Sequence, residues 1–383
     1  MAKEKKKVPD LRFKGFTNDW EQRKLGELAE IVRGASPRPI SDPKWFDANS
    51  DVGWLRISDV TNQNGKIRYL EQHISKLGQE KTRVITEPHL LLSIAATVGK
   101  PLINYVKTGV HDGFLIFLNP KFDLEFMYQW LEMFRPEWNK YGQPGSQVNL
   151  NSDLVKNQKI AIPSKEEQQK ISNFFNEMDS LIALHQRKLV LLKQLKKGLL
   201  QKMFADKDSK QPILRFADFH GDWEECKLGN IVAYKNGHGH EKEQRISGKY
   251  ELINLNSISI DGGLKHSGKY INYATSTLQK DDLVMVLSDV AHGDLLGRVA
   301  IIPEDNKFVL NQRVALLRRK TYINIRFLFS YINAHQNYFK KQGAGSSQLN
   351  ISKKSVKRFS VMLPTALEQN KIGNCLNKVD CNK

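Results

Sequence analysis

The chain has 383 residues, 40 % of them hydrophobic, and 59 Lys and Arg stand against 41 Asp and Glu, giving a formal net charge of +18. No apolar run reaches the roughly 18–20 residues of a membrane helix, and the basic start MAKEKKKVPD has no apolar stretch behind it, which excludes a membrane span and a secretory signal. A positive surplus spread over the whole chain indicates a polyanionic partner, most often nucleic acid.

The cysteine pattern excludes two further classes of protein. Cys226, Cys375 and Cys381 are too few and too scattered for a disulfide scaffold. No CxxC pair is present, which argues against a structural zinc knuckle. We therefore expect a cytoplasmic protein without a structural metal.

The chain consists of two copies of one pattern. The first copy begins with Leu-Arg-Phe at 11–13, Asp-Trp-Glu at 19–21 and Lys-Leu-Gly at 24–26, and all three motifs recur 203 residues later. A Ser-Gln-x-Asn motif at 146–149 recurs 201 residues later at 347–350. Long matches at nearly one offset predict a structural duplication with small differences in loop length.

Each copy is predicted to contain one mixed α+β globule, at residues 1–163 and 205–364. The centres of the two copies, 35–140 and 238–340, share a pattern more than they share residues. Because the centres diverge, they are candidates for separate recognition, whereas the matching flanks are candidates for common structure. Short β-rich runs punctuated by Gly, Asn, Asp and Pro occur at 90–95, 114–118, 283–287 and 314–317.

Residues 164–204, between the globules, predict one long helix. Ser164 and Glu167 form an S-x-x-E capping box that begins it. About 40 residues at 1.5 Å each give a length of roughly 60 Å, and a helix of this length needs a partner helix alongside. Its apolar stripe at spacings of three and four includes Ile171, Phe174, Met178, Leu181, Leu192, Leu195 and Leu199.

The second copy repeats the start of this helix with Thr365 and Glu368, so residues 365–383 form a second helix. Antiparallel pairing would place it beside residues 189–203 of the first helix. By comparison with the first copy, roughly 20 residues of this second helix are missing. The apolar side chains expected to stay uncovered are those of Ile171, Phe174, Phe175, Met178, Leu181 and Ile182.

The sequence lacks the familiar catalytic motifs. It contains no GxxxxGK[ST] phosphate loop, no Asp/Asn-Pro-Pro-Tyr/Phe methyltransferase motif, no GxGxxG after a strand and no HExxH. His238, His240 and Glu241 could be imagined as metal ligands, but a Gly-rich loop without a fourth ligand is better explained as a polar surface loop. A basic, duplicated chain without catalytic motifs favours a binding protein.

Candidate DNA-binding residues follow from the chemistry of base edges and phosphates. Arg and Lys bind guanine, Asn and Gln bind adenine, and phosphates take basic and hydroxyl side chains. Gln147 and Gln348 could equally stabilise a turn, which is the role that we favour for Asn149 and Asn350. The candidates at loops and strand ends are Arg33, Ser36, Arg38, Arg56, Lys100, His111 and Gln147 in the first copy, and Lys235, Asn236, His238, Lys242, His292, Arg298 and Gln348 in the second.

This ordered duplication resembles the specificity subunits of Type I restriction–modification systems, over nearly the whole chain. The resemblance rests on the flanking motifs above and on the Ile-Pro-Ser-Lys-Glu-Glu-Gln-Gln-Lys-Ile helix start at 162–171. It implies two target-recognition domains, each reading half of a bipartite site in double-stranded DNA, separated by long antiparallel coiled-coil-type helices.

The resemblance also implies partners and a division of labour. Two methylation subunits would modify adenine at N6 with S-adenosylmethionine, and motor-nuclease subunits would use ATP and Mg²⁺. The specificity subunit would bind no cofactor and have no active site of its own. The shortened second helix departs from the family pattern and puts docking of methylation subunits on the uncovered helix in doubt.

Three interpretations remain open at this point. The chain is the DNA-reading subunit of a full complex, or a truncated inactive or regulatory copy that binds DNA or a methylation subunit. As a member of another class, it could be a self-contained DNA-modifying enzyme. The uncovered apolar stripe predicts self-association through the spacer helix or capture by a protein partner.

Overall fold

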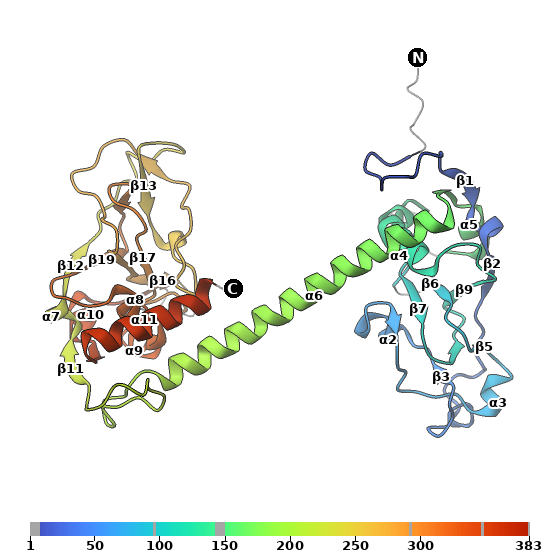
Figure 1. Ribbon diagram of the computed structural model, residues 1–383, viewed down its shortest axis with the longest axis horizontal. Helices are drawn as coiled ribbons and strands as arrows, with labels where there is room; N and C mark the ends of the chain where they lie inside the picture. Colours follow the sequence, from blue (N-terminus) through green and yellow to red (C-terminus); the bar gives the residue numbers. More distant parts are fainter. Residues whose placement is uncertain (1–7, 95–96, 142–149, 291–292, 346–347, 382–383) are drawn as a thin grey trace, which may run out of the picture. The chain divides into compact units, whose positions relative to one another are not determined.

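The computed structural model describes residues 8–94, 97–141, 150–290, 293–345 and 348–381. Its contacts divide the chain into two units, Met1–Ala183 and Leu184–Lys383, so the boundary lies inside the longest helix, α6 (Lys165–Lys202) (Figure 1). Each unit mixes helices with small sheets, which confirms the predicted α+β class. Within the described residues, no helix combines the length and the apolar character needed to cross a membrane.

The first unit begins with a strand, a short helix and a second strand, and it ends in the first part of α6. Short 3₁₀ turns occur at Pro43–Trp45 and Arg135–Tyr141. The other elements are β1 (Glu21–Lys24), α1 (Leu25–Leu28), β2 (Glu30–Arg33), β3 (Gly53–Trp54), α2 (Ile57–Asn62), β4 (Lys66–Ile67), α3 (Lys76–Gln79), β5 (Arg83–Ile85), β6 (Leu90–Ser93), β7 (Pro101–Asn104), β8 (Thr108–Val110), β9 (Phe114–Leu118), α4 (Leu124–Phe134), α5 (Ser152–Asn157) and β10 (Lys159–Ile162).

The main sheet of this unit has five strands in the order β2-β9-β6-β7-β4, beside a smaller sheet β3-β8-β5. The apolar runs predicted at 90–95 and 114–118 form its central strands β6 and β9, except that residue 95 lies outside the described residues. Successive side chains of a strand point to opposite faces. Leu90 and Leu92 accordingly pack with α4, whereas Leu91 packs in a second cluster on the other face, so the whole run is buried.

The second unit repeats the first and last elements of the first unit, with different elements between them. A 3₁₀ turn occurs at Leu255–Ser257. The other elements are β11 (Glu224–Lys227), α7 (Leu228–Ile231), β12 (Val232–Asn236), β13 (Tyr250–Ile253), β14 (Tyr270–Ile271), β15 (Leu283–Val286), β16 (Ser288–Val290), β17 (Val299–Ile301), β18 (Phe308–Leu310), β19 (Val314–Arg319), α8 (Ile325–Ala334), α9 (Gln336–Lys341), β20 (Gln348–Asn350), α10 (Lys353–Arg358), β21 (Ser360–Leu363) and α11 (Ala366–Cys381).

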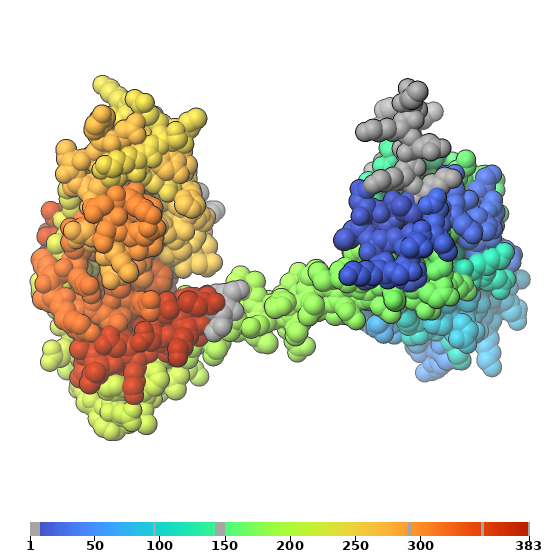
Figure 2. All heavy atoms as spheres, turned by 45° about the horizontal axis from the view of Figure 1, so that its top comes forward, coloured from blue at the N-terminus to red at the C-terminus, as the bar shows by residue number. Residues whose placement is uncertain are grey.

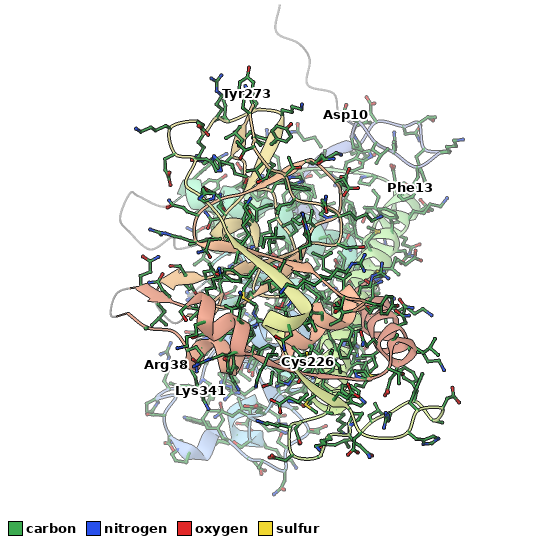
Figure 3. All side chains as sticks on the ribbon, turned by 90° about the vertical axis from the view of Figure 1, so that its left-hand side faces the viewer. Asp10, Phe13, Arg38, Cys226, Tyr273 and Lys341 are labelled. Carbon is green, nitrogen blue, oxygen red and sulfur yellow. The ribbon has the colours of Figure 1, made fainter. Side chains whose placement is uncertain are left out.

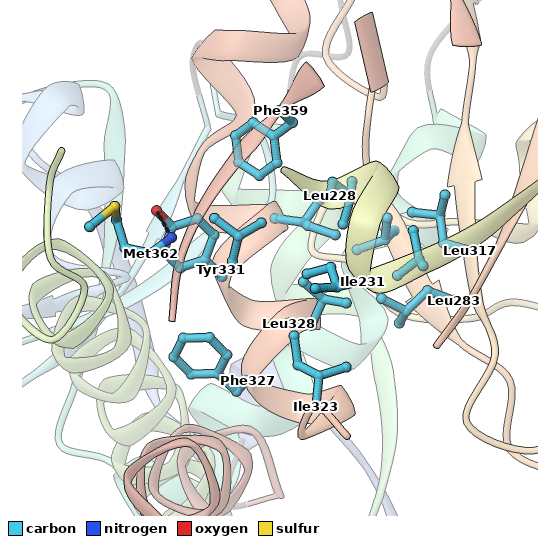
Figure 4. Close-up of a cluster of buried hydrophobic side chains, with 14 of the residues drawn as sticks. Leu228, Ile231, Leu283, Leu317, Ile323, Phe327, Leu328, Tyr331, Phe359 and Met362 are labelled. Carbon is cyan, nitrogen blue, oxygen red and sulfur yellow. Dashed lines mark hydrogen bonds between the residues drawn. The ribbon is translucent and has the colours of Figure 1, made fainter. Parts of the chain in front are cut away.

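The main sheet of the second unit, β12-β19-β15-β17, corresponds to four strands of the first. The predicted runs at 283–287 and 314–317 form β15 and β19, its central strands. Helix α8 covers one face of the sheet with Phe327 and Leu328 (Figure 4). In the same core the Tyr331 hydroxyl accepts the N–H of Met362 at 3.1 Å, so the one polar atom of this ring is satisfied.

In each unit, the repeated motifs at the start and the end of the copy lie together, and we call this region the base of the unit. Strand β1 pairs antiparallel with β10, and β11 pairs in the same way with β21, so the first and last strands of each copy lie together. Arg12 donates from Nε and Nη2 to the carboxylate of Glu167, both at 2.7 Å. Arg215 makes the same bidentate contact with Glu368, at 2.8 and 2.9 Å. The repeated Leu-Arg-Phe and Glu-Gln motifs therefore form one buried contact twice.

The glutamine that follows each of these glutamates joins the new helix to its own globule. Gln168 accepts the N–H of Asp123, the N-cap of α4, at 2.8 Å and donates to the Pro163 carbonyl at 2.8 Å. Gln369 does the same for Asn324, the N-cap of α8, at 3.0 Å. The start of each long-helix motif is thus tied to the helix that covers the main sheet.

Helix α6 confirms the long helix predicted between the copies. Its side chains Phe174, Phe175, Met178, Leu181 and Ile182 are between 43 % and 51 % exposed, as predicted. The prediction was wrong for Ile171, which packs against the core of the first unit.

Helix α11 lies at the surface of the second unit, where Figure 2 shows it in red. Asp380 of α11 accepts hydrogen bonds from Lys196 Nζ of α6 at 2.7 and 2.8 Å. Ile372 and Leu376 are buried in the same cluster as Met203. The expected contact of the second helix with residues 189–203 is therefore present, although α11 packs more extensively on α8.

Candidate nucleic-acid interface

In the first unit, four of the predicted residues gather around one carboxylate that the prediction missed, Asp112. Arg38 Nη2 donates to Asp112 Oδ2 at 2.7 Å, and Ser36 Oγ donates to Oδ1 at 2.8 Å. Arg33 Nε donates to the Asp112 backbone carbonyl at 2.6 Å, and His111 Nδ1 lies 3.1 Å from Oδ1. The loop after β2 and the turn after β8 therefore form one polar cluster.

The charges of this cluster are set by its surroundings. Burial disfavours the charged form of Asp112, but the Ser36 hydrogen bond and the charges of His111, Arg38 and Arg33 together lower its pKa below the ordinary value. Burial lowers the pKa of His111, with Arg38 and Arg33 adding to the effect. At neutral pH the cluster thus contains an ionised aspartate, a neutral histidine and two arginines.

A glycine lets the two segments approach. A Cβ on Gly34 would lie 2.2 Å from the His111 carbonyl oxygen, which no larger residue tolerates without a shift. Thr82 Oγ1 then fixes the loop by donating to the Ala35 carbonyl at 2.6 Å. Arg38, labelled in Figure 3, is held by this loop and is still 72 % exposed. Most of the Arg38 side chain is therefore accessible from solvent.

Arg56 and Lys100 lie apart from this cluster, each beside acidic side chains. Arg56 is the N-cap of α2, and it contacts Asp59 at 3.1 Å and Glu71 at 2.9 Å. Lys100, directly before β7, binds Glu132 of α4. These partners neutralise both cations and give them a structural role in the isolated chain.

In the second unit, three predicted residues line one small hollow of about 110 Å³: Lys235, Asn236 and His238. Lys235 Nζ donates to Ser276 Oγ at 2.9 Å, and Asn236 Oδ1 accepts the Tyr234 hydroxyl at 2.6 Å. All three predicted side chains are exposed. They stand at the end of β12, where Arg33, Ser36 and Arg38 stand relative to β2 in the first unit.

The turn beside this hollow repeats the close approach seen in the first unit. A Cβ on Gly237 would lie 1.8 Å from the Asn311 carbonyl oxygen. Next to this contact, Gln312 Nε2 donates to the Glu241 carboxylate. The predicted Lys242 follows on the same loop and is exposed.

The His-rich loop carries no sign of a metal centre. His240 Nδ1 lies 3.1 Å from the Glu243 carboxylate. Among the residues that the structure describes, no three His, Cys, Asp or Glu side chains are grouped as metal ligands.

The remaining predicted residues are dispersed. Arg298 lines a hollow of about 690 Å³ beside the end of α6 and α8, and its Nη1 donates to the Asn333 carbonyl at 3.1 Å. Burial lowers the pKa of Arg298. Gln348 lies on β20 and donates to Ser288 Oγ. Two further predicted residues, Gln147 and His292, lie outside the described residues.

Three residues at these loops and turns were not among the predicted DNA-binding candidates: Asp112, Glu241 and Gln312. Acidic residues are poor candidates for contact with a polyanion when each is considered alone. A usable signal existed in the sequence, because each turn comes directly before a predicted β-rich run, 114–118 or 314–317. Each turn also faces a glycine, Gly34 or Gly237, and these two glycines are 203 residues apart, as the repeated motifs are.

A family model described as the Type I restriction modification DNA specificity domain matches residues 17–194 and again residues 220–383. The chain belongs to this family. The double match falls on the two repeats, which confirms the predicted duplication and identifies a specificity subunit of a Type I restriction–modification system.

Specificity subunits from Methanocaldococcus jannaschii are similar along almost the whole chain. The putative Type I restriction enzyme MjaX specificity subunit is 23 % identical, over 94 % of this chain and 87 % of that protein. The MjaVIII specificity subunit is 20 % identical over 94 % and 86 %.

Solved structures of specificity subunits share the fold. The S subunit from M. genitalium covers 98 % of this chain and 92 % of its own length, with a TM-score of 0.61 at 15 % identity. The HsdS subunit from Thermoanaerobacter tengcongensis covers 94 % and 89 %, with a TM-score of 0.50 at 15 % identity.

Proposed function

We propose that this specificity subunit binds double-stranded DNA and recognises a bipartite sequence, one half with each repeat. The observation that carries the proposal is the repeated pair of segments at Gly34 and Gly237, which present different polar side chains from the same framework. Arginine, lysine, asparagine and histidine at these positions have the donors that base edges and phosphates accept.

The proposal assigns a role to each part of the chain. Residues 1–163 and 205–364 are the two target-recognition domains. Residues 164–204 form the central spacer helix, and residues 365–383 form the second helix of the repeated framework. Two recognition domains joined by one helix favour two half-sites at a fixed separation. Changing the length of α6 is therefore expected to change the separation of the half-sites.

We assign the chemistry to partner subunits. Two methylation subunits would use S-adenosylmethionine to modify adenine at N6, and motor-nuclease subunits would use ATP and Mg²⁺ to cleave. This chain would bind none of these cofactors and supply no catalytic residue, in keeping with a sequence that lacks the corresponding motifs. The exposed apolar side chains of α6 are our candidate for self-association of the isolated chain.

The first test is the salt dependence of DNA binding by the chain in complex with its methylation subunits. Each phosphate contact contributes a slope of about −0.9 to log K against log[salt]. A chain with a net charge of +18 should give a steep negative slope. A slope near zero would contradict a DNA-binding role.

The second test separates the two repeats. Residues 35–140 are exchanged for the corresponding segment of a specificity subunit with another target sequence, and the methylated sites are mapped. We expect one half of the recognised site to change while the other half is kept. A change in both halves would show that the repeats do not recognise DNA independently.

A further inference from the structure

In each repeat, a residue of the loop after the second strand is hydrogen-bonded to a residue of a facing turn. The two residues of this pair occupy equivalent positions in the two repeats. Arg38 is four residues after Gly34, and Glu241 is four residues after Gly237. Asp112 is two residues after the end of β8, and Gln312 is two residues after the end of β18. In both repeats the first member of the pair is hydrogen-bonded to the second.

The surrounding backbone supports this correspondence. Gly34 N–H donates to the Phe114 carbonyl at 2.9 Å, and Gly237 N–H donates to the Val314 carbonyl at 3.0 Å. Phe114 begins β9 and Val314 begins β19, which are equivalent strands of the two main sheets.

The chemistry of the pair is reversed between the repeats. In the first, a cationic donor on the loop, Arg38, meets a carboxylate on the turn, Asp112. In the second, the carboxylate is on the loop, Glu241, and the turn provides the neutral amide of Gln312. The side chains that can donate to a base edge are therefore a guanidinium in one repeat and a carboxamide in the other.

These two groups select different bases. A guanidinium has donors only and matches the O6 and N7 acceptors of guanine in the major groove. A carboxamide has both a donor and an acceptor and matches the N7 and N6 groups of adenine. Arg38 is 72 % exposed and Gln312 is exposed, so both reach the surface of their repeat.

From these contacts we propose that Arg38 recognises a guanine in one half-site and that Gln312 recognises an adenine in the other. The inference rests on the proposed DNA-reading function and adds to it the residues that determine specificity. Asp112 and Glu241 are the positioning residues, which hold each side chain in a defined direction before DNA arrives. The Arg38–Asp112 pair can be exchanged for a base at little cost, because ion pairs near the surface are weak. The Gln312–Glu241 hydrogen bond is exposed, so water can replace either partner.

The test selects bound sequences from a randomised DNA library with the complex of this chain and its methylation subunits. Each good bidentate contact discriminates by about 5- to 150-fold, which corresponds to 1–3 kcal/mol at 1.4 kcal/mol per factor of ten. Arg38→Ala should abolish the preference for guanine at one position of one half-site. Gln312→Ala should abolish the preference for adenine at one position of the other.

Exchange variants make the test sharper. Arg38→Gln should shift its position from guanine to adenine, and Gln312→Arg should shift its position from adenine to guanine. Arg38→Lys keeps the positive charge but loses the planar, bidentate arrangement of donors. It should therefore reduce discrimination between bases with little loss of DNA affinity. Lys159→Ala, which removes one exposed charge from β10, is the matched control and should leave every base preference unchanged.

The outcomes separate this inference from the proposed function. If the unmodified complex selects a bipartite sequence but Arg38→Ala and Arg38→Lys leave its base preferences intact, the assignment of Arg38 is wrong and DNA reading stands. Uniform weakening on all sequences would make Arg38 a phosphate contact and would also overturn the assignment. The same criteria apply to Gln312. If the unmodified complex shows no sequence preference, the proposed function itself fails.

Discussion

The first and second repeats differ in the partner of the basic residue that directly precedes β7 in the first and β17 in the second. In the first, Lys100 precedes β7 and binds the carboxylate of Glu132 on α4. In the second, Arg298 precedes β17 and donates to the backbone carbonyl of Asn333 on α8. At the base of each unit, by contrast, the Arg12–Glu167 contact and the Arg215–Glu368 contact are nearly identical.

The two repeats agree at the base and differ in the middle because the basal contacts contain buried carboxylates. The basal contacts lie in a buried setting, where the side chains of Glu167 and Glu368 are 2 % and 1 % exposed. A buried charge without its partner is costly, so the pair changes only as a whole. In the middle of the repeat, Lys100 meets a carboxylate that is 28 % exposed and Arg298 meets a neutral backbone carbonyl. Neither contact depends on a fully buried carboxylate, so the sequence there is free to diverge.

The largest expected effect comes from breaking one basal contact. Glu167→Gln leaves Arg12 without a carboxylate, and removal of one partner of a buried pair typically costs about 3–5 kcal/mol. Because the Glu167 side chain is 2 % exposed, we expect the largest loss of stability among the variants considered, confined to the first unit. Hydrogen exchange resolved by peptide should show faster opening in the first unit and unchanged protection in the second.

The matched control is Glu166→Gln, because Glu166 is the exposed neighbour of Glu167 on the same helical turn. It should leave exchange unchanged in both units. Glu368→Gln should give the reciprocal result, with faster exchange in the second unit alone. Equal effects of Glu166→Gln and Glu167→Gln would show that the basal contact does not stabilise the repeat.

An intermediate effect on stability is expected at the two glycines where, in both repeats, a loop lies against the backbone of a turn. Gly34→Ala and Gly237→Ala place a methyl group 2.2 Å and 1.8 Å from a carbonyl oxygen. Relieving such contacts typically costs about 1–3 kcal/mol in the free energy of unfolding. Urea denaturation should detect this loss, and DNA affinity should fall as well because both clusters would be displaced.

Gly198→Ala provides the opposite control. A Cβ on Gly198 meets no atom within 4 Å, and the residue lies inside α6. Alanine is favoured over glycine in a helix by about 0.5–1 kcal/mol, so this variant should be slightly more stable. If Gly34→Ala is as stable as Gly198→Ala, the approach of the two segments is not a constraint.

The next prediction concerns self-association through the first half of α6, where apolar side chains are exposed. Leu181 is 50 % exposed, whereas Met203, directly after the end of α6, is 3 % exposed and packed in the second unit. Full burial of a leucine stabilises by about 1.5–3 kcal/mol, so half of that from each of two copies amounts to about 2 kcal/mol. Leu181→Lys should therefore weaken self-association about 30-fold in analytical ultracentrifugation.

Ser180→Lys adds the same charge one residue away and should have less effect, because Ser180 contributes no apolar side chain. A native chain that remains monomeric at all concentrations would contradict self-association through this helix.

The smallest effect concerns pH. The pKa of Asp112 is lowered, so its contribution to stability is complete above the ordinary aspartate range and disappears as the pH falls through the lowered pKa. Since the Asp112 contact with Arg38 is near the surface, we expect less than about 1 kcal/mol. Urea midpoints measured from pH 7 to pH 3 should show this loss in the native chain. In Asp112→Asn that part of the pH dependence should be absent.

The sequence predicted the elements whose signals are local or repeated. The helix from Ser164 onward, the central strands of both sheets and the duplication all depend on spacing, capping and self-similarity. Of the candidate site, it located Arg33, Ser36, Arg38 and His111, which the structure brings together.

The side-chain partners could not be predicted in the same way. Arg38 and Asp112 are 74 positions apart, and Lys100 and Glu132 are 32 apart, so their contacts depend on how the strands and helices pack. Ile171 illustrates the same limit, because its place in the apolar stripe of α6 does not reveal that the start of this helix contacts the first core.

The hydrophobic interior of this chain is divided in the same way as its sequence. The buried clusters around β6 draw their residues from positions 25–162, and those around β15 draw theirs from positions 203–376. Cooperative unfolding requires a shared interior, so we expect each repeat to have its own melting equilibrium. A destabilising substitution in one repeat should then leave the other folded, and calorimetry should resolve two transitions in place of one.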